Sequence, residues 1–201
     1  MTAYPPEPWH LAGQAYVSLW RLPVADLPKL PDGAEPVVLG GRAQVIAAWI
    51  DYQEPGQLSY HELLSTVAVR GKRPSASITD IWVDSEVSLA GGRALWGIPK
   101  NLASLGFTHG RTFTATAATD DWIATAAFTR RPGLPIATPA AFDVVQALGG
   151  QLKRSPVAAK AKPHPAIADW SINALGPLGY LAGRRPVVSV SLRDFTLRFG
   201  G

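Results

Sequence analysis

Hydrophobic and polar positions along the chain recur mostly with the period of a β-strand. Residues 43–53 form an almost continuous apolar run, which suits a strand buried on both faces. Within residues 112–117, threonines alternate with apolar side chains, as expected of a strand with one apolar face. The clearest strand pattern covers residues 187–199. The chain is therefore predicted to consist mainly of strands.

Other strand-like segments are short and separated by turn signals. They occupy residues 14–21, 57–70, 75–83 and 122–129, with weaker ones at 142–148, 151–162 and 165–172. The 18 prolines and 19 glycines also favour a turn-rich β protein, either a barrel or a sandwich. A length of 201 residues fits a single domain spanning residues 1–201.

One segment in the middle of the chain has helical spacing. Ser85 is a good N-cap, and Glu86 in the first turn favours the positive end of the helix dipole. The pair Gly91-Gly92 predicts a close approach of another element to the helix backbone. Pro99 is expected to end the helix, which would place Lys100 on a stiff loop just beyond it. Residues 24–30 are predicted to form a second, short helix.

Composition and charge exclude several classes of protein. No run of 18 apolar residues predicts a membrane span, and the N-terminal residues resemble no secretory signal. The chain has no cysteine, so we expect a cytoplasmic location. The net charge is +4, but the basic residues are scattered, which disfavours nucleic-acid binding. The four histidines lack metal-ligand spacing, so neither a metal nor another cofactor is expected.

The most informative segment runs from Gly92 to Leu102. It places Lys100 directly after Pro99, among residues that are mostly apolar or glycine. A lysine amine held in an apolar pocket gives up its proton more readily, and the neutral amine can form a Schiff base with a ketone or aldehyde. The alternative is an ordinary surface lysine at the end of a helix.

This segment resembles the active-site signature of the acetoacetate decarboxylase family. Gly92-Arg93 and Pro99-Lys100 match that signature at its spacing, and Tyr60-His61-Glu62 is similar to the family's Tyr-x-Glu strand motif. The resemblance implies a mainly β, antiparallel, cone-shaped β-barrel with a few short helices and an interior site. It also implies a decarboxylase-like lyase that acts on a small organic acid or ketone and forms a homo-oligomer.

The sequence departs from the family at several charged positions. Asn101 stands where the decarboxylase has a second lysine, and Ala94 stands where it has a glutamate. Gly13 falls near a family arginine, and Ala47 or Ala48 replaces a further carboxylate. Because of these departures, the resemblance does not identify acetoacetate as the substrate.

The other candidate site residues follow from strand geometry and from the motif. Residues of equal parity on a strand share a face, so Tyr60 and Glu62 are expected to point the same way, either into the interior or towards solvent. The resemblance to the family implies the interior. Glu62 would then move protons, and Tyr60 would position a substrate oxygen. Arg93 either holds a substrate carboxylate or has a structural role. Trp96 is expected to provide an apolar wall for the substrate.

Three functions remain open at this stage. The first is decarboxylation of a small keto acid through a Lys100 Schiff base. The second is aldol or dehydration chemistry through the same intermediate. The third is a non-catalytic barrel that binds a small molecule, with no lyase activity.

Overall fold

The computed structural model describes residues 3–133 and 136–201. Its elements are β1 (Trp9–Pro23), η1 (Val24–Asp26), β2 (Val38–Leu39), β3 (Arg42–Gln53), β4 (Tyr60–Val69), β5 (Ser75–Val83), α1 (Glu86–Trp96), β6 (Lys100–Leu102), β7 (Ser104–Thr108), β8 (Thr112–Ala118), β9 (Trp122–Arg130), β10 (Thr138–Leu148), β11 (Gln151–Ile172), η2 (Gly179–Leu181) and β12 (Val188–Phe199). The prediction of a mainly β chain is confirmed.

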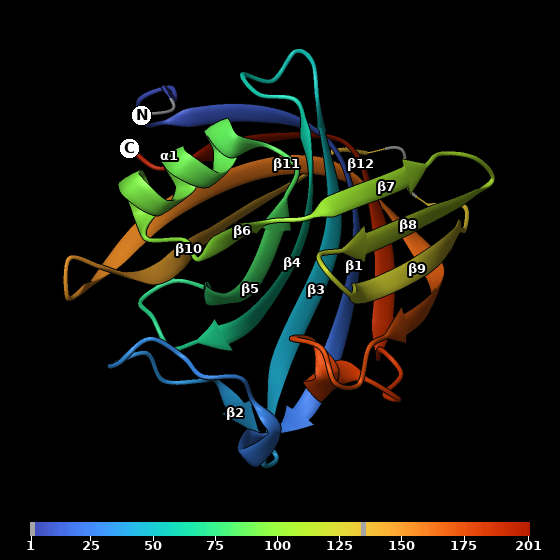
Figure 1. Ribbon diagram of the computed structural model, residues 1–201, viewed down its shortest axis with the longest axis horizontal. Coiled ribbons are helices and arrows are strands. Elements are labelled where there is room, and N and C mark those ends of the chain that lie inside the picture. The colour runs from blue at the N-terminus through green and yellow to red at the C-terminus, as the bar shows by residue number, and fades with distance from the viewer. Residues whose placement is uncertain (1–2, 134–135) are drawn as a thin grey trace.

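The twelve strands form one strongly curved sheet. Ten of them follow the order β10-β5-β4-β3-β1-β12-β11-β9-β8-β7, while β2 pairs with β3 and β6 pairs with β5. Strand β10 also pairs with β11. The strands from β10 to β11 therefore curl around a common interior (Figure 1). Most pairs are antiparallel, as the resemblance implied, but β5 pairs with β10 in parallel over only two residue pairs. The enclosure is thus less regular than an evenly hydrogen-bonded barrel.

Strands β9, β8 and β7 continue this sheet from the second half of β11 and fold back as an outer layer (Figure 1). Their apolar side chains, including Phe113 and Phe128, pack against Tyr16, Trp49 and Leu63 from the inner strands. Residues 49 and 63 alternate with residues that face the interior, so the two faces of β3 and β4 have different partners. One face meets the outer layer, and the other lines the interior.

Several predicted boundaries are wrong. The expected helix at residues 24–30 is only the single turn η1. Residues 151–162 and 165–172 form one continuous strand, β11, which pairs first with β10 and later with β9. The strand continues through Pro163 and Pro165 at the place where its pairing changes from β10 to β9. The sequence pattern of one strand does not reveal such a change of partner.

Helix α1 begins as the sequence predicts but ends earlier. The Ser85 hydroxyl accepts a hydrogen bond from the Ser88 N–H at 3.2 Å. The helix ends at Gly97, whose φ of 67° lies in the left-handed region favoured by glycine, and not at Pro99. Lys100 then begins the short strand β6 beside Ile81 of β5, so the expectation of a loop position is wrong.

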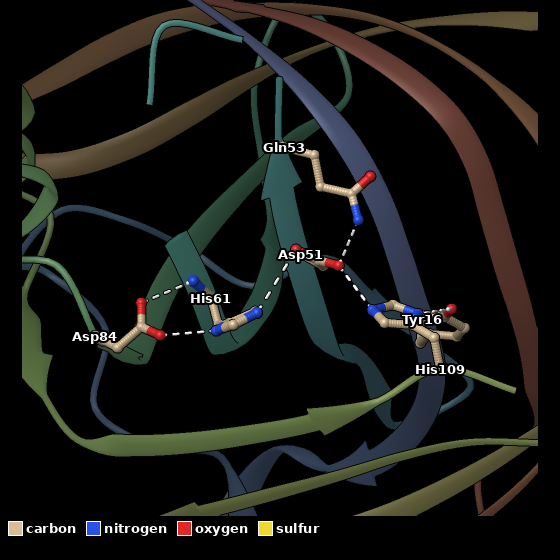
Figure 2. A network of polar contacts seen from close by, with 6 residues as sticks. All are labelled: Tyr16, Asp51, Gln53, His61, Asp84 and His109. Carbon is tan, nitrogen blue, oxygen red and sulfur yellow. Dashed lines mark hydrogen bonds and ion pairs between the residues drawn. The ribbon is translucent and has the colours of Figure 1, made fainter. Parts of the chain in front are cut away.

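A polar network lies on the outward face of β3 and β4 (Figure 2). Asp51 is only 8% exposed, and its Oδ2 is 2.7 Å from His109 Nε2 and 2.6 Å from Gln53 Nε2. His61 Nε2 lies 3.6 Å from Asp51 Oδ1, while its Nδ1 lies 2.7 Å from Asp84 Oδ2. Burying a carboxylate is costly unless it has such partners, so the network fixes the geometry of the strands that supply it.

The network also connects the two layers. His109 comes from the turn between β7 and β8, and its Nδ1 lies 3.3 Å from the hydroxyl of Tyr16 on β1. Asp84 lies between β5 and α1. Among residues 3–133 and 136–201, no group of three or more histidine, cysteine or acidic side chains could hold a metal ion. No helix in these ranges is long and apolar enough to cross a membrane.

Replacing Asp51 with alanine tests this structural role. We expect the free energy of unfolding to fall by about 2 kcal/mol, because the partly buried side chains of Gln53, His61 and His109 would lose a charged and buried partner. Urea denaturation gives the measurement. The control is Asp194→Asn, which removes an exposed ion pair with Lys162 and should cost about 1 kcal/mol or less. Equal losses in the two variants would contradict a stabilising role for the network.

Candidate active site

Lys100 is buried, although lysine normally lies in water. The residue is 4% exposed, and its side chain lies against the backbone of α1 at Gly92. A Cβ atom at position 92 would lie 2.8 Å from Cδ and Cε of Lys100, so glycine is required for this approach. The predicted close approach at Gly91-Gly92 is therefore found, and at Gly92 the approaching group is the lysine side chain.

The Lys100 ammonium group has three buried hydrogen-bond partners. Nζ donates to Glu62 Oε2 at 2.9 Å, to Ser88 Oγ at 2.7 Å and to the Tyr60 hydroxyl at 3.3 Å. These partners come from β4 and α1, so the site depends on the packing of the helix against the sheet. The buried charge on Nζ is balanced by the Glu62 carboxylate, which is 2% exposed as a residue.

Two tyrosines complete the surroundings of Glu62. The Tyr52 hydroxyl donates to Oε1 at 3.2 Å, and the Tyr60 hydroxyl donates to Oε2 at 3.4 Å. Their rings are stacked, with centroids 4.5 Å apart. Burial raises the pKa of both phenols well above the usual value, and the nearby Glu62 carboxylate raises each pKa further. Both phenols therefore stay protonated and act as donors.

The Lys100 site opens into a cavity of about 440 Å³ inside the curved sheet. Most of its walls are apolar side chains of β1, β3, β4, β5, β10, β11 and β12. Among the described residues that line it, Lys100 is the one basic side chain and Glu62 the one acidic side chain. Such a cavity, apolar with a few convergent polar groups, is typical of a small-molecule site.

Trp96 lies in the cavity wall, where the sequence placed it. Its ring packs edge-on against Trp9, with centroids 4.8 Å apart, and its Nε1 donates to Glu7 Oε2 at 2.7 Å. The one polar group of the indole, its N–H, is thus satisfied by Glu7, which does not line the cavity. Trp96 therefore offers its apolar surface to a ligand.

Arg93 does not line the cavity. Its side chain lies on the exposed face of α1, where Nε donates to the backbone carbonyl of Lys100 at 2.8 Å and Nη2 donates to Asn101 Oδ1 at 3.0 Å. The sequence left two roles open for Arg93, binding a substrate carboxylate or a structural role. These contacts fit the structural role. Arg93 holds the backbone from which the Lys100 side chain projects.

The positions that depart from the family signature fall on different faces. Asn101 and Ala94 are exposed and lie outside the cavity. Ala48 lines the cavity, whereas Ala47 lies on the opposite face of β3 in a separate core cluster. The cavity thus has a small apolar side chain at position 48 on its wall.

Sequence reasoning missed two residues of the site, Tyr52 and Ser88. Tyr52 lies at the end of the apolar run 43–53, directly opposite Tyr60, so strand pairing brings them together. Ser88 is four residues before Gly92, and positions four apart share a helix face. The helical spacing of Ser88 could be found in the sequence. The position of Tyr52 could not, because it depends on the register of β3 and β4.

The arrangement combines an amine, a carboxylate and two phenols around one end of an apolar cavity. The amine can act as a nucleophile once it passes its proton to Glu62, 2.9 Å away. The tyrosines hold the carboxylate in place and can donate to a substrate oxygen. Because these groups are preorganised by backbone elements, little rearrangement is required for reaction.

Comparison with solved structures supports this fold. The acetoacetate decarboxylase from Legionella pneumophila subsp. pneumophila str. Philadelphia 1 is 18% identical, with a TM-score of 0.74 over 100% of this chain and 88% of that one. The enduracididine biosynthesis enzyme MppR complexed with pyruvate is 20% identical, with a TM-score of 0.70 over 100% and 90%. An acetoacetate decarboxylase-like enzyme from Sphingomonas wittichii RW1 is 14% identical, with a TM-score of 0.70 over 96% and 91%.

No curated protein sequence matches the chain significantly. The family model described as acetoacetate decarboxylase (ADC) matches residues 6–152, which include the whole segment from β1 to α1 and Lys100. This match covers well over half of the chain, so the protein belongs to the acetoacetate decarboxylase family.

Proposed function

We propose that the protein is a Schiff-base enzyme in which Lys100 attacks the carbonyl carbon of a small keto acid and promotes its decarboxylation. The observation that carries this proposal is the buried Lys100 amine, bonded to Glu62 at the polar end of an apolar cavity. Membership of the acetoacetate decarboxylase family supports it, as do the similar solved structures of the enzyme MppR. One of these is complexed with pyruvate and another with the condensation product of pyruvate and imidazole 4-carboxaldehyde.

The reaction would begin with transfer of a proton from the Lys100 amine to Glu62. The neutral amine adds to the carbonyl carbon, and the carbonyl oxygen leaves as water with the proton returned by Glu62, giving an iminium ion. The bond to the carboxylate then breaks, and its electron pair moves onto the iminium nitrogen. Carbon dioxide and an enamine result. Protonation at carbon and hydrolysis release the ketone, so one solvent proton is consumed overall.

The apolar cavity favours this outcome for a β-keto acid. A carboxylate in such surroundings is poorly solvated, and its conversion to neutral carbon dioxide removes the buried charge. Tyr60 would position the substrate oxygen, and Trp96 would contact the substrate's apolar part. Single-domain organisation, a cytoplasmic location and assembly into a homo-oligomer remain predictions from the sequence and the family.

A second candidate is aldol or dehydration chemistry through the same iminium ion. It is favoured by the absence of a basic side chain other than Lys100 among the described residues of the cavity wall, since a substrate carboxylate would have no separate partner. Glu62 would then remove a proton from the carbon next to the iminium. Carbon dioxide release from a panel of keto acids separates this candidate from decarboxylation.

Borohydride reduction tests the Schiff base directly. Incubation with pyruvate or a β-diketone, followed by borohydride, should add the reduced ligand to the peptide that contains Lys100, as read by peptide mass mapping. Lys100→Met should abolish this adduct, while exposed lysines such as Lys162 serve as internal controls for non-specific reaction. An unmodified Lys100 peptide would contradict covalent catalysis and favour a barrel that only binds its ligand.

The raised pKa of Tyr60 gives a prediction about pH. Because burial keeps this phenol protonated, it should act as a neutral donor up to about pH 10 or above and create no alkaline limb below that value. Tyr60→Phe should therefore lower kcat about tenfold or more without moving the alkaline limb of the pH profile. Tyr16→Phe, on the outer face, is the control. If the alkaline limb of the pH profile disappeared in Tyr60→Phe but not in Tyr16→Phe, the role of Tyr60 as a neutral donor would be refuted.

A further inference from the structure

The polar groups of the cavity are distributed unevenly along its length. Lys100, Glu62, Tyr52 and Tyr60 gather at one end. Away from this end, the inward-facing pairs of β3 and β4 are Ala48 opposite Leu64 and then Ile46 opposite Thr66. The end that holds Lys100 is therefore continuous with a groove along β3 and β4. Over these two pairs its walls are apolar except for the hydroxyl of Thr66.

This groove is longer than a very small keto acid requires. Thr66 lies four residues beyond Glu62 on the same face of β4, and a strand rises about 3.4 Å per residue, so the groove extends about 14 Å from the carboxylate. Apolar side chains from other strands, including Val17, Val144 and Leu192, also face it. A volume of about 440 Å³ lies within the range of sites for drug-sized ligands.

The charges of the cavity restrict what this groove can hold. Lys100 and Glu62 already neutralise each other at the reactive end. The polar side chains Gln44, Thr66 and Ser75, also in the cavity wall, are neutral. A charged group on the distal part of a substrate would lose its hydration without gaining an ionic partner among the described residues, which is strongly unfavourable.

We propose that the substrate is a carbonyl compound with an extended apolar body, whose carbonyl lies at Lys100 and whose body occupies the groove along β3 and β4. The inference rests on the proposed function for the placement of the carbonyl, and it specifies that the keto acid carries an apolar chain on the side of the carbonyl away from its carboxylate. Apolar contact with the groove supplies the binding free energy. Distal carboxylates, as in dicarboxylic keto acids, are excluded.

Chain-length dependence of binding tests the substrate class without requiring catalysis. Isothermal titration of the Lys100→Met variant with 2-butanone, 2-hexanone and 2-octanone measures non-covalent affinity alone. Each buried methylene should strengthen binding about fourfold, so the four methylenes that separate 2-butanone from 2-octanone should raise the affinity about 250-fold if all are buried. The doubly charged keto acid 2-oxoglutarate should bind more weakly than 2-octanone. Equal affinities, or tighter binding of 2-oxoglutarate, would overturn the inference.

A matched pair of variants locates the apolar body. Ile46→Phe adds volume to the groove away from Lys100 and should reduce the ratio of 2-octanone to 2-butanone affinity. Ile46→Ala removes volume and should leave that ratio undiminished. Circular dichroism melting identifies any variant that fails to fold, and the ketone series on Lys100→Met decides the question independently. A ratio unchanged in a folded Ile46→Phe would contradict placement along β3 and β4.

Borohydride trapping of the wild-type protein with the same ketones separates this inference from the proposed function. Graded binding without any covalent adduct would overturn the Schiff base but support an apolar ligand class. Covalent trapping with equal yield for all three ketones, together with flat affinities in Lys100→Met, would support the Schiff base and overturn the apolar class.

Discussion

The buried ion pair between Lys100 and Glu62 is the interaction on which the site depends. Two opposite charges 2.9 Å apart have been removed from water, and such a pair persists only where further hydrogen bonds satisfy both groups. Ser88, Tyr52 and Tyr60 provide those bonds from α1, β3 and β4. The pair therefore links the position of the helix to the register of the sheet, and an error in either would leave a buried charge without its partner.

Strand alternation explains how one pair of strands serves two purposes. On β3 and β4, Tyr52, Tyr60 and Glu62 face the cavity, while Asp51 and His61 belong to the polar network on the opposite face. The residues of the two sets are neighbours in sequence, so the network restrains the backbone positions from which the active-site side chains project. A rigid support of this kind is what the proposed catalysis requires, because it keeps the side chains of the site in a fixed geometry.

The sequence was sufficient to predict the site motif and its face, but not all of its partners. Lys100 and Glu62 were predicted from a local signature and from strand parity, both of which depend on nearby residues. The contact of Arg93 with the Lys100 carbonyl could not be assigned, because an arginine in this motif fits either role. Tyr52 was missed because its pairing with Tyr60 depends on register, and the helix end was misplaced because Gly97 adopts a left-handed conformation two residues before Pro99. The prediction was thus limited mainly by contacts between residues distant in sequence, and less by the identification of the chemical groups.

A double-mutant cycle on the stability of the protein tests the central ion pair most directly. The cycle compares Lys100→Met, Glu62→Gln and the double variant with the wild type by urea denaturation at neutral pH. Each single change should lower the free energy of unfolding by about 3 kcal/mol, because it leaves the other buried group without its charged partner. The double variant should lose less than the sum, by about 1.5 kcal/mol or more. Strict additivity of the two losses would show that the charges do not interact in the folded protein and would contradict the account.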